Sequence, residues 1–512
     1  MGSPVANAVI RRVPADYSTI QQAINAAVNG DTVLVAPGTY VENINFGGKA
    51  VTVTSEAGPQ VTIIDGNHLG TVVTFGSGET SASVLNGFSI RNGDSPSGAR
   101  FQGGGVAIFN ASPIITNNLI TSNKRIDEGG GIVIEGGSPT IRNNTITNNM
   151  AVDSGGGIAV NFGSPIIEGN QISHNQAPSS GGGISVLGTS TVLIVGNSIT
   201  ENTTFAGGGI ELFSSGPVII RNNVISDNRA SFEGGGIDSV NLSPALIIQN
   251  LIVRNQSLQG GGIFWSNPPN SVINNTIADN DALIGSGIWA GFSRDTRFIN
   301  NIVIGKSGQI TFFCREADGL PTVFMSNDVF TRQGTAYGGS CPDQTGINGN
   351  ISADPLFVNP IAVKYHLLSS SPAIDKGNNS APNLPVTDFD GKPRIQDGNG
   401  DGIAIVDMGA YEFPAPFDLC IQDDSSSSLL QINTTTGEYQ FTNCGGLSIG
   451  GTGTLTKRGS LTTLQHNSSD RRVIATIDTA TGKATASVQL FSQGRTFSIT
   501  DRNITNNTCA CR

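Results

Sequence analysis

Residues 129–154 read GGGIVIEGGSPTIRNNTITNNMAVDS, and this pattern returns along the middle of the 512-residue chain. A glycine triplet followed by isoleucine, or a close variant of it, recurs in steps of 25 to 27 residues. The first glycines of these elements are Gly103, Gly129, Gly155, Gly181, Gly207, Gly234, Gly260 and Gly285. A fixed step of this size indicates a solenoid built from stacked repeats.

A second element, Asn-x-Ile-x-x-Asn, keeps the same step. Its first asparagines are Asn118, Asn144, Asn170, Asn197, Asn223, Asn250, Asn275 and Asn301. Its second asparagines are Asn123, Asn149, Asn175, Asn202, Asn228, Asn255 and Asn280, and Lys306 takes this place in the last coil. Because asparagine tolerates bends and can hydrogen-bond a neighbouring amide, we interpret both ladders as structural.

The apolar residues between these elements alternate with period two, as in Ile132-Val133-Ile134. Period two indicates strands, and about 26 residues without helical periodicity are too few for a propeller blade or a helix pair. One such coil cannot enclose a core, so the coils must stack about 4.8 Å apart. The sequence therefore predicts an all-β fold, a parallel β-helix over residues 51–352.

The two ends differ from the repeat. Ser18-Thr19-Ile20-Gln21 has the pattern of a capping box and predicts a short helix within residues 1–50, which would cap the first coil. Residues 353–413 lack the repeat, and Pro414-Ala415-Pro416 is typical of a linker. Residues 417–512 return to alternating Thr, Val and Ile, which predicts a small antiparallel β domain.

The six cysteines fall into two groups, without the spacing of a zinc site. Cys314 and Cys341 are one coil apart, so they should lie on adjacent rungs within bridging distance. Cys420, Cys444, Cys509 and Cys511 are expected to form disulfides within the C-terminal domain, with the connectivity left open. Disulfides indicate an oxidising compartment and hence secretion.

The net charge of −11 argues against nucleic acid or anionic lipid as a partner, because no basic stripe is present to neutralise phosphates. No apolar run reaches 18 residues, so no transmembrane helix is predicted. The charge is compatible with a cation or a neutral glycan as ligand.

One column of the repeat changes its chemistry. The second residue after each triplet should point outward, at Ala107, Val133, Ala159, Ser185, Glu211, Asp238, Phe264 and Trp289. Glu211 and Asp238 would lie one rung apart, about 4.8 Å, which is close to the carboxylate spacing of a retaining glycosidase. Phe264 and Trp289 would offer aromatic faces to sugar rings. These four residues form the predicted ligand site; the alternative is that outward positions simply vary.

A calcium site is predicted near residue 400. Asp397, Asn399 and Asp401 alternate before Gly402, and Asp407 follows. Oxygen ligands at alternate positions and a glycine for the turn are what calcium loops use. The closing acid falls one position early for an EF-hand, so a Gly/Asp-rich turn without a metal is the alternative.

Residues 13–66, with Pro14-Ala15-Asp16-Tyr17 and Pro37-Gly38-Thr39-Tyr40, resemble the opening of pectin-lyase-like right-handed β-helix proteins. Residues 353–413 resemble the tail of secreted bacterial β-helix proteins with a choice-of-anchor region. Asp501-Arg502-Asn503-Ile504 and the residues after it are similar to a C-terminal module of secreted proteins from acidobacteria-like bacteria. These resemblances imply a right-handed helix and secretion, and leave the reaction open because the superfamily includes lyases, hydrolases, esterases and adhesins.

The enzyme motifs of that superfamily are missing. Polygalacturonases need Asn-Thr-Asp, Gly-His-Gly and Arg-Ile-Lys, and none of these occurs. The outward column has no Lys or Arg, which disfavours a lyase. The sequence therefore predicts a non-catalytic extracellular surface, matrix or adhesive protein that binds polysaccharide or self-associates into filaments. The alternative is a polysaccharide lyase or glycoside hydrolase that uses Glu211 and Asp238.

Overall fold

The computed structural model describes residues 8–94, 104–188, 191–241, 243–266, 271–292, 296–316, 320–360, 364–414, 419–422, 428–432, 438–443, 447–458, 461–478, 483–491 and 495–503. The chain divides into two compact units. The first comprises Met1–Ile395 and Val406–Glu412, and the second Gln396–Ile405 and Phe413–Arg512.

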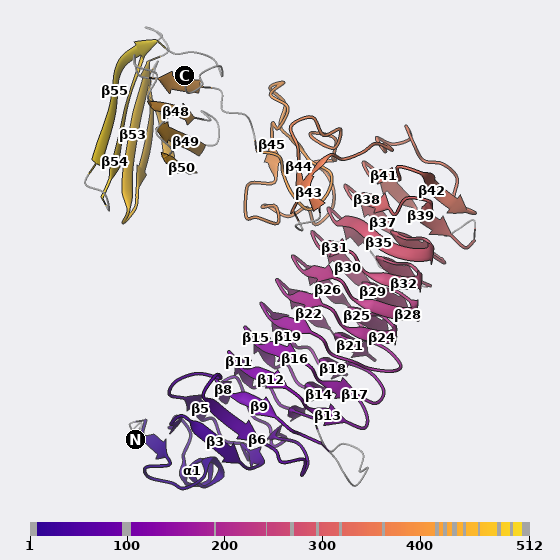
Figure 1. Cartoon of the computed structure of the whole chain (residues 1–512), viewed down its shortest axis with the longest axis vertical. Coiled ribbons are helices and arrows are strands. Elements are labelled where there is room, and N and C mark those ends of the chain that lie inside the picture. Colours follow the sequence, from indigo (N-terminus) through magenta and orange to yellow (C-terminus); the bar gives the residue numbers. More distant parts are fainter. Residues whose placement is uncertain are drawn as a thin grey trace, which may run out of the picture. The chain divides into compact units, whose positions relative to one another are not determined.

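The first unit is a right-handed parallel β-helix, as predicted, whose coils lie one above another (Figure 1). Its strands form three parallel sheets. The first sheet contains β1 (Ile10–Val13), β2 (Thr32–Val35), β5 (Thr52–Ser55), β8 (Val84–Asn86), β11 (Ile114–Thr116), β15 (Thr140–Arg142), β19 (Ile166–Glu168), β22 (Val192–Val195), β26 (Val218–Arg221), β30 (Ala245–Ile248), β34 (Ser271–Ile273), β37 (Arg297–Ile299) and β40 (Val323–Met325).

The second sheet contains β4 (Ile44–Asn45), β7 (Val73–Phe75), β10 (Val106–Phe109), β14 (Ile132–Glu135), β18 (Ile158–Asn161), β21 (Ile184–Leu187), β25 (Ile210–Phe213), β29 (Ile237–Val240), β33 (Ile263–Trp265), β36 (Ile288–Ala290), β39 (Gln309–Cys314) and β42 (Gly334–Gly339).

The third sheet contains β3 (Gly38–Val41), β6 (Thr62–Asp65), β9 (Ser89–Arg91), β12 (Leu119–Thr121), β16 (Thr145–Thr147), β20 (Gln171–Ser173), β23 (Ser198–Thr200), β27 (Val224–Ser226), β31 (Leu251–Val253), β35 (Thr276–Ile284), β38 (Ile302–Gly305) and β41 (Asp328–Phe330). It is extended through β35 by three further strands, β24 (Thr203–Ala206), β28 (Arg229–Glu233) and β32 (Gln256–Gln259). A separate pair is formed by β13 (Lys124–Arg125) and β17 (Met150–Ala151).

Columns of isoleucine fill the interior. On β14, Ile132 and Ile134 are fully buried, and each is paired in register with the equivalent residue of the next coil, Ile158 or Val160. Burying such a side chain contributes roughly 1.5–3 kcal/mol relative to leaving it exposed. Because the same side chain recurs above itself, the core is continuous along the coils.

The asparagine ladders are structural, as predicted. Asn223, for example, is buried; its Oδ1 accepts the backbone N–H of Asn197, and its own N–H donates to Oδ1 of Asn250. The positive φ expected at the bends is found one position earlier, at residues such as Asn222 (φ 56°) and Gln249 (φ 55°). The ladder residue can therefore point inward, because its predecessor turns the chain.

The helix at the N-terminus is α1 (Ile20–Ala26), whose N-cap is Thr19. The backbone N–H groups of Ile20 and Gln21, in its first turn, donate to the Glu42 carboxylate. The negative charge of Glu42 also interacts favourably with the positive end of the helix dipole. Among the described residues, no helix is long and apolar enough to cross a bilayer.

The segment after the last coil folds back as a tail, residues 353–395 and 406–412. It contains β43 (Phe357–Asn359) and β44 (Lys364–Leu367), and the short strands β45 (Ile395–Gln396) and β46 (Ile405–Val406) pair with each other. A buried ion pair joins Arg394 Nη1 to Glu412 Oε1 at 2.9 Å, and Nη2 donates to the Gly409 carbonyl at 2.7 Å. This pair fixes the end of the tail.

The second unit contains the predicted antiparallel β module. One sheet contains β47 (Leu419–Gln422), β48 (Ser428–Ile432), β49 (Glu438–Asn443) and β50 (Leu447–Thr452). The other contains β51 (Thr454–Arg458), β52 (Leu461–Asn467), β53 (Arg471–Asp478), β54 (Lys483–Leu490) and β55 (Arg495–Asn503). They share a core that includes Phe441 and Val473.

Cys314 and Cys341 form a disulfide, as predicted from their spacing of one coil. Their Cα atoms are 5.0 Å apart. Cys420 belongs to β47, but its side chain lies outside the described part of the structure, as do Cys444, Cys509 and Cys511. Their disulfides stay a prediction.

Candidate functional site

The predicted ligand column is stacked as expected. Glu211 on β25 is the register partner of Asp238 on β29, which in turn pairs with Phe264 on β33. Phe264 is the partner of Trp289 on β36, and their rings stack with centroids 4.2 Å apart. The repeat therefore predicted correctly which side chains meet.

The expected exposure of this column is wrong. Glu211 is 5% exposed, Asp238 2%, Phe264 3% and Trp289 6%. In the described coils, the first glycine of the triplet lies against the residue four positions later: a Cβ placed on Gly234 would lie 2.7 Å from the Cβ of Asp238. The chain before each triplet thus folds back over the outward face of the second sheet, so these side chains are not available to a polymer at the surface.

Burial controls the ionisation of the two carboxyl groups. Burial raises the pKa of Glu211 to about 7, although hydrogen bonds from Ser180 and Ser185 act against the increase. Burial, together with the nearby Glu211 and Glu233 charges, raises the pKa of Asp238 well above its ordinary value. Because raised values of this kind also occur at active sites, exposure decides the interpretation, and here both groups are enclosed.

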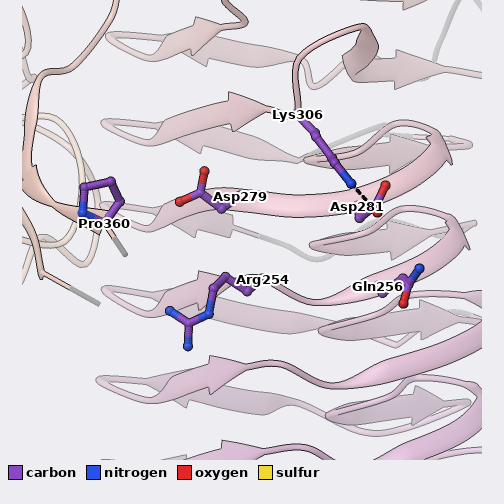
Figure 2. Close-up of a pocket in the computed structure, with 6 residues that line it drawn as sticks. All are labelled: Arg254, Gln256, Asp279, Asp281, Lys306 and Pro360. Carbon is purple, nitrogen blue, oxygen red and sulfur yellow. Dashed lines mark hydrogen bonds and ion pairs between the residues drawn. The ribbon is translucent and has the colours of Figure 1, made fainter. Parts of the chain in front are cut away.

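An open hollow of about 520 Å³ lies on the third sheet instead (Figure 2). It is lined by Arg254, Gln256, Asp279, Asp281, Lys306 and Pro360. In Figure 2, Arg254 and Asp279 point toward the side on which Pro360 lies, and Lys306 reaches across one coil to Asp281. We call this feature the surface groove.

Ion pairs and hydrogen bonds hold the acidic side chains of the surface groove. Lys306 Nζ lies 2.5 Å from Asp281 Oδ2, and Gln309 Nε2 donates to Asp281 Oδ1 at 2.7 Å. Burial acts to raise the pKa of Asp281, but these two donors lower it below the ordinary value. The Tyr365 hydroxyl donates to Asp279 Oδ2 at 2.8 Å. Both side chains therefore accept hydrogen bonds from fixed donors.

Arg254 is oriented by the coil below it. Its Nε donates to Asp227 Oδ1 at 2.8 Å, and Nη2 lies 2.5 Å from Asp227 Oδ2. This forked contact raises the pKa of Arg254, although burial acts against it. A guanidinium held in this way is a fixed, planar donor.

An apolar ladder continues beside the surface groove. Phe205, Leu258 and Leu283 are 50%, 39% and 71% exposed, on β24, β32 and β35. Phe232 on β28 stacks against Phe205 with ring centroids 5.3 Å apart. We call Phe205, Phe232, Leu258 and Leu283 the apolar ladder; its strands β32 and β35 also supply Gln256 and Asp281 to the groove.

Sequence reasoning missed the surface groove, although two signals were present. In five successive coils, an ionisable residue directly precedes the asparagine of the second ladder. These residues are His174, Glu201, Asp227, Arg254 and Asp279. Lys306 breaks the second ladder at its last step and forms one side of the groove. The other side comes from Pro360 in the tail, whose position could not be derived from the repeat.

Three of the four predicted calcium ligands, Asp397, Asn399 and Asp401, belong to a polar loop in the second unit. Asp397 Oδ1 accepts the N–H groups of Gly400 and Asp401, and Oδ2 accepts that of Gly402. These bonds wrap the loop around the Asp397 carboxylate, and the oxygen donors suit calcium. Asp407 belongs to the first unit, where it is buried and its Oδ1 accepts the Asp375 N–H at 2.7 Å. Calcium binding stays a prediction.

A comparison with protein families supports the fold of the central coils. Residues 104–267 match the family model described as right handed beta helix region. A family PL6 alginate lyase, AlyGC, is 16% identical with a TM-score of 0.39; the match covers 74% of this chain and 60% of that one. The pectin methylesterase from carrot is 13% identical with a TM-score of 0.29, over 58% of this chain and 84% of its own. This chain thus spans about 60% of the length of the alginate lyase, and no curated protein matches its sequence.

Proposed function

We propose that this protein is a non-catalytic, extracellular β-helix scaffold that binds polysaccharide along the surface groove and the apolar ladder. The main observation behind the proposal is that both carboxyl side chains of the groove, Asp279 and Asp281, are held by neighbouring donors. Asp281 is held ionised by Lys306 and Gln309, and Asp279 accepts from Tyr365. General acid catalysis needs a protonated carboxyl near the substrate, whereas the donors to Asp281 in the groove lower the pKa of that carboxyl.

The same geometry supports binding of a polymer. Charged and amide side chains offer fixed donors and acceptors to sugar hydroxyls, and they repeat at the coil spacing of about 4.8 Å. The exposed Phe205 ring can pack against the apolar face of a sugar ring, as aromatic side chains do in binding sites. An extended chain can therefore contact equivalent groups on successive coils.

Binding is tested by calorimetry of the full chain with a panel of neutral and acidic polysaccharides. We expect at least one polymer to bind, and the double variant Arg254→Ala, Lys306→Ala and the single variant Phe205→Ala to weaken it at least fivefold. Phe491→Ala is the matched control, because Phe491 is 48% exposed in the second unit. Equal binding by all variants would contradict the proposed surface.

Catalysis is tested on the same panel. Reducing-end and unsaturated-product assays should stay at background for the wild-type chain. Turnover that disappears in Glu211→Ala would instead establish a lyase or hydrolase, and the non-catalytic proposal would then be wrong.

A further inference from the structure

A third ladder of amide side chains runs along the edge of the first sheet. It contains Asn222, Gln249, Asn274 and Asn300, one per coil, all with φ between 53° and 60°. In the last two coils these side chains hold the tail. Asn300 Oδ1 accepts the Asn378 N–H at 2.7 Å, and Asn274 Nδ2 donates to the Asp407 and Gly409 carbonyls at 3.2 Å. This corner ladder therefore binds polypeptide backbone.

The two earlier members of the corner ladder, Asn222 and Gln249, line a hollow of about 480 Å³. Gln249 is fully buried, and its Nε2 donates to Asn222 Oδ1 at 3.1 Å. Its Oε1 has no hydrogen-bond partner among the described residues. A buried carbonyl without a donor is unfavourable, so an N–H donated by a ligand would relieve that penalty.

The apolar surface under the tail also continues into this hollow. Ile273 and Ile299, on the outward face of the first sheet, are covered by Ala381 of the tail. Arg221 and Ile248 occupy the equivalent column in the coils below, and they line the hollow beside the half-buried Ile219 and Leu246. The tail covers the coils above with turns, in which the Ala381 N–H donates to the Asn378 carbonyl and the Leu384 N–H to the Ala381 carbonyl. Its next residues, 383–387, form the other side of the hollow.

A positively charged side chain also lines the hollow. Arg221, at the end of β26, lines it and is exposed. No ion pair joins Arg221 to any residue that the structure describes. On a chain with a net charge of −11, an unpaired guanidinium beside an apolar hollow favours a ligand with a carboxylate.

We propose that this hollow binds a short peptide segment of a partner protein, which carries a carboxylate for Arg221 and an apolar side chain for Ile219 and Leu246. The peptide continues the binding mode of the chain's own tail: its backbone N–H donates to Gln249 Oε1. A peptide is favoured over a sugar because the two neighbouring members of the ladder already hold backbone amides and carbonyls.

The test is selection of a random octapeptide display library on the full chain, followed by synthesis of the enriched peptides. We expect enriched sequences to contain an Asp or Glu beside an apolar residue. Replacing that acid by its amide, or the chain's Arg221 by Ala, should weaken binding at least tenfold. Methylating one backbone nitrogen of the peptide should have a similar effect. Arg142→Ala is the matched control, because Arg142 is exposed at the equivalent place on β15.

Gln249→Leu separates binding from structure. This variant removes the unpaired carbonyl, so the chain should melt at or above the wild-type temperature while peptide binding falls at least fivefold. The proposal is overturned if no peptide is enriched over the Arg221→Glu chain, or if enriched peptides bind equally to Arg221→Ala and Gln249→Leu. Capture of an acidic oligosaccharide at Arg221, without any peptide, would also overturn it.

Discussion

Glu211 and Asp238 are direct register partners on neighbouring parallel strands, and both are enclosed by the glycines that precede them. Two carboxyl groups one rung apart inside a protein repel each other when both are ionised. This pair is therefore stable as a largely protonated unit, and its titration couples the fold to pH.

The stability of the helix should fall as pH rises. The pKa of Glu211 is about 7 in the folded chain against an ordinary 4.5, so the unfolded chain loses this proton first. For this group alone, the free energy of unfolding then decreases by about 3 kcal/mol between about pH 4.5 and about pH 7. Urea unfolding at pH 5 and pH 8 measures the difference, and Glu211→Gln should reduce it. Glu316→Gln, at the surface, should leave it unchanged; an unchanged profile in Glu211→Gln would contradict the assignment.

Removing one rung of an asparagine ladder should destabilise the helix strongly. Asn223→Ala leaves the buried Asn197 N–H and Ile194 carbonyl without partners, which costs about 1–3 kcal/mol for each group. Chemical denaturation followed by circular dichroism should show the loss, whereas Asn25→Ala on the exposed face of α1 should change little. Similar stabilities for the two variants would show that the ladder is not structural.

Breaking the buried ion pair of the tail should be costly. Arg394→Met leaves the Glu412 carboxylate enclosed without its partner, and the loss should be about 3–5 kcal/mol. The matched control is Arg332→Met, because Arg332 pairs with Asp354 at an exposed position where the loss should stay below about 1 kcal/mol. If thermal unfolding showed equal losses of stability in the two variants, the role given to the buried ion pair would be contradicted.

Calcium should stabilise the second unit if the loop at Asp397 binds it. At a calcium concentration one hundred times the dissociation constant, the stabilisation is about 2.7 kcal/mol. Chelation should lower the melting temperature of the full chain, and Asp397→Asn should abolish that response, whereas Asp470→Asn should preserve it. A melting temperature that does not respond to chelation would rule out the site.

The repeat was sufficient to predict the fold because each coil contains the same short sequence pattern. Period-two apolar residues give strands, and a constant step places like residues above one another, as Glu211 above Ser185 and Cys314 beside Cys341. The sequence also identified both asparagine ladders and the disulfide. These features depend only on spacing and on the stacking of identical coils.

The exposure of outward side chains and the position of the tail could not be derived from the repeat. Val133 and Glu211 are outward in register and yet buried, because the chain before each glycine triplet folds back over them. The surface groove needs Pro360, and the second hollow needs residues 383–387, all brought to the helix by a non-repeating segment. Sequence alone therefore determined the coil, its register and its core, since those follow from local periodicity. Tertiary structure decided which surfaces stay open, because that depends on contacts between segments far apart in the chain.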